Sequence, residues 1–241
     1  MFYDRLAELY DEMTEFDRHL TGDTGIFREV IARFPAEHIL DAGCGTGLHS
    51  LIFAGLGIRV TGIDNSVAMI RRARENAERR GLNAEFTKAD FLDFRTRLKE
   101  NFDAVYCLGN GFVHLQNDAD RVTVLENFRT ILNRNGLVCL QILNYDRILS
   151  EKPGLISDKK GPHHRFIRTY EYQHDRIIFR LEVKGLLEPF ELTQPLFPVT
   201  SREIIPLAEN AGFSRVNLTG SLFLDPFDPK RSANICAWMF P

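Results

Sequence analysis

The feature that most constrains the fold is an alternation of short apolar runs with amphipathic helical patterns between residues 24 and 143. Between the runs, apolar residues recur with the helical period, as in the helix expected after Ser66 and ending at Gly81. Nearly continuous apolar runs are typical of strands buried on both faces, and they lie at residues 38–41, 59–63, 84–88, 102–108 and 137–143. The pattern predicts a doubly wound α/β fold with a mostly parallel sheet.

The pattern changes between about residues 150 and 198, where apolar and polar residues alternate along 166–172 and 177–183 around a turn at His174-Asp175. This alternation indicates an antiparallel meander. A capping box at Thr200–Glu203 then begins a helix, and residues 213–218 and 234–239 are expected to form a closing hairpin at the sheet edge. We therefore expect seven strands in the main sheet. Its domain would comprise residues 1–145 and 199–241, with 146–198 as an inserted antiparallel lid.

Composition excludes several classes of partner. The formal net charge of −3 gives no electrostatic basis for binding nucleic acid. No run of about 18 apolar residues is present, so no membrane span is expected, and residues 1–5 do not resemble a signal peptide. The four cysteines form no C-x-x-C pair, which predicts neither a metal site nor a disulfide framework and favours the cytoplasm.

A glycine-rich loop, Asp41-Ala42-Gly43-Cys44-Gly45-Thr46-Gly47, follows the first strand. Open α/β sheets bind ligands at this edge, and glycine lets the backbone approach a ligand closely. A dinucleotide fingerprint requires a third glycine where this chain has Leu48. The Asp41 carboxylate beside the loop disfavours a pyrophosphate and suits a cationic ligand such as S-adenosylmethionine, which has an ammonium, a sulfonium and no phosphate.

Two further acids follow the next strands. Asp64 ends the second strand, where a carboxylate can accept both hydroxyls of a ribose, although it could also cap the helix after Ser66. Asp90 follows the third strand and could accept a hydrogen bond from an adenine amino group, with Phe91 against the ring; a simple turn acid is the alternative.

The series D-x-G-C-G-T-G, an acid after the second strand and A-D-F after the third resembles the class I methyltransferases over about residues 36–143. The resemblance implies a Rossmann-like fold and S-adenosylmethionine as co-substrate, without a metal. Residues 6–11 also look like family members in which a tyrosine closes over the cofactor, so Tyr10 is either such a cover or a core aromatic. The cofactor residues implied are Tyr10, Asp41, Gly43, Gly45, Gly47, Asp64, Asn65, Met69, Asp90, Phe91, Leu108 and Gly109.

A narrower resemblance links residues 100–150 to the glycine N-methyltransferase group, through Leu108-Gly109-Asn110-x-Phe112-x-His114-Leu115 and Asn144-Tyr145-Asp146. Asn110 lies after the fourth strand, where its side-chain oxygen could orient the acceptor, and Tyr145 either lines the pocket or packs in the core. His114 is a candidate base or a structural histidine.

One departure from that group concerns the substrate. An arginine that grips the substrate carboxylate precedes Asn-Tyr-Asp in the group, and here the residue is Leu143. Losing a desolvated ion pair costs about 2–5 kcal/mol, so we predict that glycine is not the substrate. The candidate replacement cations are Arg147, Arg168 and Arg180.

These observations predict an S-adenosylmethionine-dependent methyltransferase acting on a small molecule, most simply an amine other than glycine. Two alternatives stay open at this point: a nicotinamide-dependent oxidoreductase and a non-catalytic S-adenosylmethionine-binding protein. The sequence leaves a homo-oligomer open and predicts neither a nucleic acid nor a membrane partner.

Overall fold

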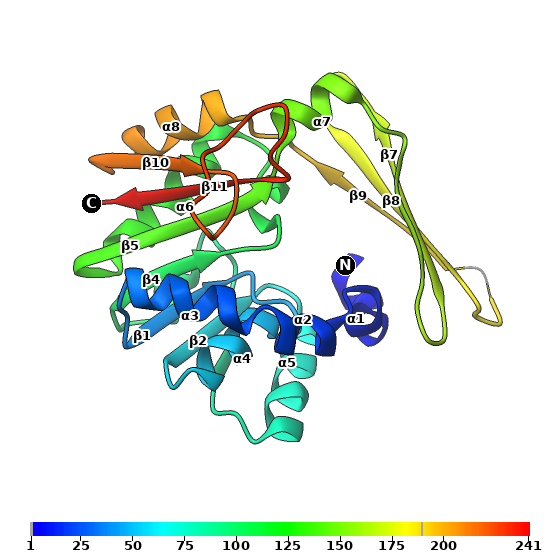
Figure 1. Cartoon of the computed structure of the whole chain (residues 1–241), viewed down its shortest axis with the longest axis horizontal. Coiled ribbons are helices and arrows are strands. Elements are labelled where there is room, and N and C mark those ends of the chain that lie inside the picture. Colours follow the sequence, from blue (N-terminus) through cyan, green and yellow to red (C-terminus); the bar gives the residue numbers. More distant parts are fainter. Residues whose placement is uncertain (1, 189) are drawn as a thin grey trace.

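The computed structural model describes residues 2–188 and 190–241, which form two sheets with flanking helices (Figure 1). The larger sheet has seven strands in the order β10-β11-β5-β4-β1-β2-β3. Its first five strands along the chain are parallel, and at one edge β11 pairs antiparallel with both β5 and β10, so that β10 again runs parallel to the first five. The predicted fold class is confirmed. The strands are β1 (His38–Ala42), β2 (Arg59–Asp64), β3 (Glu85–Lys88), β4 (Phe102–Cys107), β5 (Leu132–Leu143), β10 (Arg215–Thr219) and β11 (Asn234–Phe240).

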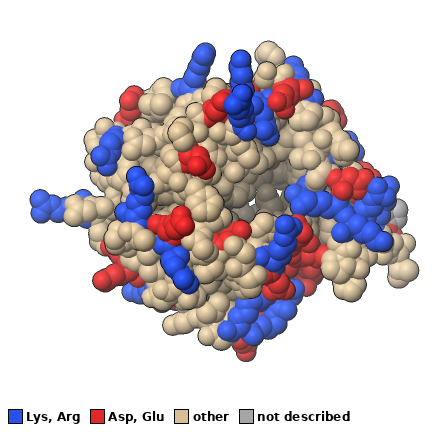
Figure 2. Space-filling view, viewed as in Figure 1, with Lys and Arg blue, Asp and Glu red and all other residues tan. Residues whose placement is uncertain are grey.

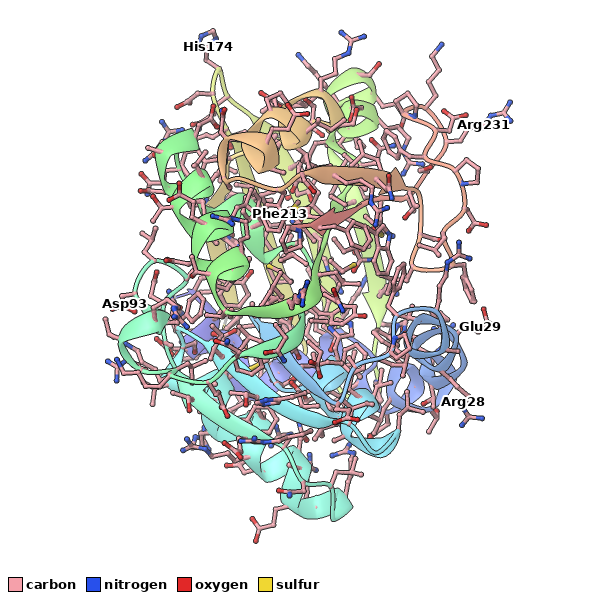
Figure 3. All side chains as sticks on the ribbon, turned by 90° about the vertical axis from the view of Figure 1, so that its left-hand side faces the viewer. Arg28, Glu29, Asp93, His174, Phe213 and Arg231 are labelled. Atoms are coloured by element: carbon pink, nitrogen blue, oxygen red, sulfur yellow. The ribbon has the colours of Figure 1, made fainter. Side chains whose placement is uncertain are left out.

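Helices cover both faces of this sheet, which explains why its strands are apolar throughout. One face packs against α3 (Thr24–Arg33), α4 (Leu48–Gly55) and α5 (Val67–Arg80). The other packs against α6 (Asp118–Thr130) and α8 (Ser201–Asn210). Figure 3 shows Arg28 and Glu29 of α3 pointing away from the protein, while Phe213 after α8 belongs to the core.

The predicted antiparallel meander is present as a separate four-stranded sheet in the order β6-β7-β8-β9. Its strands are β6 (Leu155–Lys160), β7 (Arg165–Tyr172), β8 (Ile177–Lys184) and β9 (Phe190–Leu196), and α7 (Tyr145–Glu151) leads into it from β5. The proposed domain boundaries stay a prediction.

The N-terminal helix α1 (Phe2–Met13) lies between the two sheets (Figure 1). Its apolar side forms one buried cluster with the four-stranded sheet, in which Leu6 and Met13 meet Phe166, Leu181 and other residues of β7–β9. Its polar side contacts α5, where Asp11 pairs with Arg72 at 2.9 Å. The helix therefore bridges the inserted sheet and the main domain. It is followed by α2 (Phe16–Gly22), and single 3₁₀ turns occur at Phe94–Thr96 and Gly111–His114.

Local signals placed most element ends correctly. Ser66 caps α5 by accepting the Met69 N–H, and Gly81 ends that helix with a φ of 62°. The Glu203 carboxylate accepts hydrogen bonds from the backbone and the hydroxyl of Thr200 at the start of α8. Within the described parts of the chain, no helix has the length and apolar character needed to cross a membrane.

One predicted boundary is wrong. The apolar run at residues 137–143 predicts a strand from Leu137, but β5 already begins at Leu132. The strand bulges opposite Asp103, because Leu132 pairs with Phe102 while Leu137 pairs with Ala104. A Cβ atom at Gly136 would lie 2.9 Å from the Asp103 carbonyl oxygen and 3.1 Å from that of Asn133, so the glycine permits a close backbone approach within the bulge.

Candidate active site

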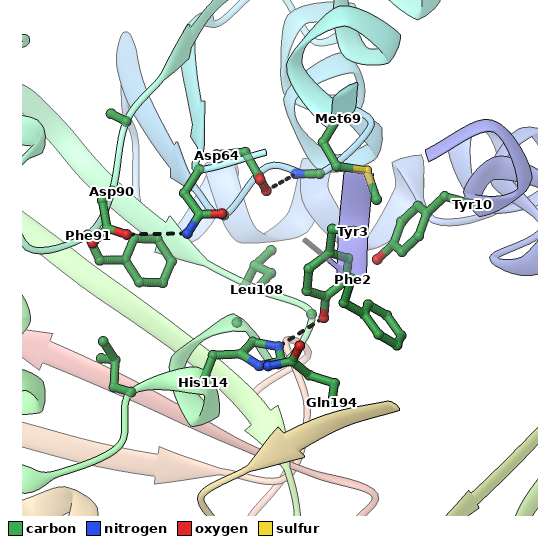
Figure 4. Close-up of a pocket in the computed structure, with 17 residues that line it drawn as sticks. Phe2, Tyr3, Tyr10, Asp64, Met69, Asp90, Phe91, Leu108, His114 and Gln194 are labelled. Carbon is green, nitrogen blue, oxygen red and sulfur yellow. Dashed lines mark hydrogen bonds between the residues drawn. The ribbon is translucent and has the colours of Figure 1, made fainter. Parts of the chain in front are cut away.

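A cavity of about 380 Å³ opens at the carboxyl edge of the parallel strands, walled by their loops, by α1 and by β9. Figure 2 shows the surface hollowed between the main domain and the inserted sheet, and Figure 4 shows the lining side chains. Most of the site residues predicted from the sequence meet here: Tyr10, Gly43, Gly45, Asp64, Asn65, Met69, Asp90, Phe91, Leu108, Gly109 and His114. Asp41, Gly47, Asn110 and Tyr145 do not line it.

The glycine loop turns tightly over the end of β2. Gly43, Gly45 and Gly47 all have a positive φ, a conformation that side chains disfavour. The N–H groups of Gly43 and Cys44 both donate to the carbonyl oxygen of Ile63, at 2.8 and 2.9 Å. A Cβ atom at Gly43 would lie 3.1 Å from the Phe91 ring, so the glycine leaves room for the ring at the cavity wall.

Gly47 lies behind the cavity and has a packing role. A Cβ atom at Gly47 would lie 3.1 Å from the Phe86 ring. A Cβ atom at Gly62 on β2 would lie 2.7 Å from the same ring. The buried Phe86 side chain of β3 thus packs against two glycines and holds the loop against the second strand. The sequence motif marked Gly47 but carried no sign of this contact.

Asp64 connects the loop to the helix that follows β2. One carboxylate oxygen accepts the Gly45 N–H at 3.0 Å, and the other accepts the Ser66 N–H at 2.9 Å. Burial raises the pKa of Asp64, an effect that these two N–H groups partly oppose. The carboxylate therefore faces the cavity with lone pairs left for hydroxyl donors, as a ribose would supply.

The loop after β3 brings an acid and an aromatic ring to the cavity. The side-chain amide of Asn65 donates to Asp90 at 3.2 Å, and Asp90 also accepts the Leu92 N–H at 3.0 Å (Figure 4). Phe91 presents its ring to the cavity between the loops after β1 and β4, close to Gly43 and Gly111. An acceptor beside an aromatic face is the combination that a purine requires.

The direct role predicted for Asp41 is not supported by its position. The residue shares the sheet face of Ile39 and is only 1% exposed, and its carboxylate accepts the Ser50 hydroxyl of α4 at 2.5 Å. Burial raises the pKa of Asp41 to about 6. A strand alternates its side chains between faces, and this alternation points Asp41 toward α4 beneath the loop instead of into the cavity.

Asn110 and Tyr145 also lie behind the cavity wall, in one hydrogen-bonded chain. The Asn110 oxygen accepts the Leu143 N–H at 3.1 Å, and its amide donates to the Tyr145 hydroxyl at 2.9 Å. Tyr145 is fully buried and its hydroxyl bonds in turn to Tyr170 of β7. The oxygen predicted to orient the acceptor is therefore engaged by backbone, and the chain ties β4 and β5 to the inserted sheet.

Several residues that line the cavity were not among the site residues predicted from the sequence. Tyr3 of α1 places its hydroxyl 2.9 Å from Nε2 of His114 (Figure 4). Phe2, Ala89, Gly111, Leu115 and Gln194 of β9 also line the cavity. No local signal could find Tyr3 or Gln194, because each reaches the site only through long-range packing of its element.

Burial keeps both Tyr3 and His114 uncharged at neutral pH. It raises the pKa of the Tyr3 phenol well above its ordinary value and lowers the pKa of His114 to about 4. The phenol therefore stays protonated, and its hydroxyl donates a hydrogen bond to Nε2 of a neutral imidazole. Nδ1 then carries the ring hydrogen and faces the Pro195 carbonyl without reaching hydrogen-bond geometry.

None of the three candidate replacement arginines lines the cavity. Arg168 donates to the Met13 carbonyl at the end of α1 at 2.9 Å. Arg180 pairs with Glu191, and Arg147 lies 3.9 Å from Glu151. Within residues 2–188 and 190–241 the cavity wall contains two carboxylates, Asp64 and Asp90, and neither lysine nor arginine.

Comparison with known proteins identifies a domain within the chain. Residues 39–136 match the family model described as a methyltransferase domain. The glycine/sarcosine N-methyltransferase of Aphanothece halophytica is 33% identical over 150 residues, which are 62% of this chain and 57% of that enzyme. The chain thus spans little more than half of the length of this relative.

Solved structures extend the similarity of fold to nearly the whole chain. An S-adenosylmethionine-dependent methyltransferase from Clostridium acetobutylicum superposes with a TM-score of 0.80 over 99% of this chain and 98% of its own, at 14% identity. The amino pentose methyltransferase CalS10 from Micromonospora echinaspora, solved with S-adenosylmethionine bound, has a TM-score of 0.72 over 97% of both chains, at 19% identity. Residues 39–136 thus form a methyltransferase domain, which contains the glycine loop and the two acids of the cavity, and the whole chain has the fold of S-adenosylmethionine-dependent methyltransferases.

Proposed function

We propose that the protein transfers a methyl group from S-adenosylmethionine to the amino nitrogen of a small acceptor that has no carboxylate. The observation that carries this proposal is the single cavity in which the predicted cofactor residues and a neutral polar end, formed by Tyr3 and His114, share one wall. Relatives named as glycine/sarcosine and amino pentose methyltransferases support an amine acceptor.

The residues present fit this co-substrate. Asp64 and Asp90 would accept hydrogen bonds from the ribose and the adenine, and Gly43 and Gly45 would let the backbone approach the methionine portion. The two carboxylates and the absence of any lysine or arginine from the described lining suit a cationic nucleoside and oppose a pyrophosphate. This charge pattern disfavours the nicotinamide-dependent alternative.

When bound, S-adenosylmethionine supplies an electrophilic methyl group on a positively charged sulfur. The protein then has to align the amine and exclude water. The Tyr3 hydroxyl donates a hydrogen bond to His114. Its oxygen still has lone pairs that can accept a hydrogen bond from an amine N–H. Phe2 and Leu115 close the apolar side of the same space.

The pKa of His114 argues against the general-base role considered from the sequence. An aliphatic ammonium titrates near 10, whereas His114 titrates near 4. The imidazole is therefore too weak a base to hold a proton taken from the methylated amine, and that proton must pass to water. We assign His114 as a positioning residue that orients Tyr3, and Asn110 and Tyr145 as positioning residues behind the wall.

This assignment predicts different effects for two variants. Tyr3→Phe should lower kcat/KM for the amine about 10- to 30-fold, the effect of one hydrogen bond of about 1.5–2 kcal/mol. The kcat/KM of His114→Gln for the amine should stay within about threefold of the wild-type value, because the glutamine amide oxygen can still accept a hydrogen bond from the Tyr3 hydroxyl. The pH profile between 5 and 8 should be unchanged in His114→Gln, since neither residue titrates there. If the pH profile of the wild type has an inflection near neutrality that His114→Gln loses, His114 acts as a general base and this assignment is wrong.

The proposed function itself is tested by binding and turnover with wild-type protein. Calorimetric titration should show saturable binding of S-adenosylmethionine, and labelled cofactor should transfer its methyl group to small primary amines. Glycine should be methylated at least about 30-fold more slowly than the best amine, because no cation faces its carboxylate. Binding without transfer to any amine, acid or phenol would favour the non-catalytic alternative, and efficient methylation of glycine would contradict the proposed acceptor class.

A further inference from the structure

The acceptor end of the cavity contains one side chain whose hydrogen-bonding capacity is largely unused. Tyr3 and His114 are bonded to each other at 2.9 Å. Gln194 makes only a long contact, from Nε2 to the carbonyl oxygen of its neighbour Pro195 at 3.4 Å, and its Oε1 accepts from none of the residues described by the structure. Gln194 and His114 both line the cavity and are drawn together in Figure 4.

The position of Gln194 within β9 makes this unused amide significant. Alternation along the strand places it on the same side as Leu192 and Leu196, which are 6% and 4% exposed. Across the ladder it pairs with Phe179 of β8. The inner side of this sheet is thus apolar around Gln194, and packing alone favours a leucine there. Gln194 is half-buried in the cavity wall, so its amide is open to the cavity and able to hydrogen bond a ligand bound there.

The chemistry of the amide narrows what that partner is. A primary amide both donates and accepts, and so does a hydroxyl group, so the two match in either orientation. A carboxylate offers only acceptors and requires a cation in a buried site, and no lysine or arginine lines the described cavity. An ammonium offers only hydrogen-bond donors, and the Tyr3 oxygen already supplies an acceptor for them. A neutral hydroxyl is the group that Gln194 fits best.

We propose that Gln194 determines acceptor specificity by hydrogen bonding a hydroxyl carried next to the methylated amine, so that the acceptor is a hydroxylated amine. This inference rests on the proposed function and adds to it the chemical class of the acceptor. Tyr3 of α1 holds the amine and Gln194 of β9 holds the hydroxyl, so α1 and the inserted sheet must both be in place for the acceptor to bind productively.

A matched pair of amines tests this proposal: trans-2-aminocyclohexanol and cyclohexylamine, which differ by one hydroxyl. Their dissociation constants are measured by calorimetry with protein saturated with S-adenosylhomocysteine, and their kcat/KM values with S-adenosylmethionine. In the wild type, the hydroxylated amine should bind about tenfold more tightly and react about tenfold faster. Gln194→Leu should reduce both preferences to about one, with unchanged affinity for S-adenosylhomocysteine.

The control variant is Thr193→Val, which changes the adjacent, exposed residue on the outer side of β9 and should retain the preference. Equal binding of the two amines by the wild type, or a preference that survives Gln194→Leu, would overturn the role of Gln194. Methylation of either amine in that case would leave the proposed function standing. A hydroxyl preference in binding without any methyl transfer would support recognition by Gln194 and contradict the proposed reaction.

Discussion

Replacing Asp64 with alanine is expected to weaken S-adenosylmethionine binding about 100-fold. The Asp64 carboxylate accepts the N–H groups of Gly45 and Ser66 and has remaining lone pairs directed at the cavity. Its removal would take away the proposed ribose acceptor and one of the three hydrogen bonds that hold the glycine loop to the end of β2. Hydrogen bonds to a charged group contribute about 1.5–3 kcal/mol each, and about 2.7 kcal/mol corresponds to the expected change in dissociation constant.

The measurement is a calorimetric titration with S-adenosylhomocysteine, accompanied by urea unfolding to establish that the variant is folded at the temperature used. Asp64→Asn should bind more tightly than Asp64→Ala, because its amide oxygen still accepts one of the two N–H groups. Asp175→Ala is the matched control, since Asp175 is exposed in the turn between β7 and β8 and does not line the cavity. An affinity for Asp64→Ala within threefold of the wild type would remove Asp64 from the cofactor site.

Replacing Gly62 with valine is expected to lower the free energy of unfolding by about 3 kcal/mol or more. A Cβ atom at Gly62 would lie 2.7 and 2.9 Å from two carbons of the Phe86 ring and 3.0 Å from Sγ of Cys44. Phe86 is buried and also packs against Gly47, so the ring cannot move aside without disturbing the start of α4. Overpacking of a rigid core costs about 1–3 kcal/mol and occasionally more.

Unfolding in urea, followed by the fluorescence of the only tryptophan, Trp238, measures this loss. Gly25→Ala in α3 is the matched control, because no atom lies within 4 Å of its Cβ position, and it should be neutral or stabilising by about 0.5 kcal/mol. Adding Phe86→Leu to Gly62→Val should restore part of the stability, since the overlapping ring atoms are removed. A Gly62→Val protein as stable as the wild type would show that Phe86 does not hold the loop rigidly.

The sequence by itself determined the fold class, the cofactor loop and the acids after β2 and β3. These features are local: strand and helix periodicity, a glycine run that permits positive φ, and polar residues where strands end. Parallel strands bring their carboxyl ends to one edge, and Gly43, Asp64 and Asp90 therefore meet in the cavity without any long-range information. The meander after α7 was predictable for the same reason, because alternation is a property of neighbouring residues.

Only the tertiary structure decided what surrounds the acceptor and which motif residues face the cavity. Asp41 belongs to the glycine motif but turns under the loop to Ser50, because the face of a side chain depends on what packs there. Tyr3 and Gln194 are separated by most of the chain and meet near His114 only because α1 docks on the inserted sheet. Side-chain direction and docking arise from packing between distant segments, and no local pattern contains that information.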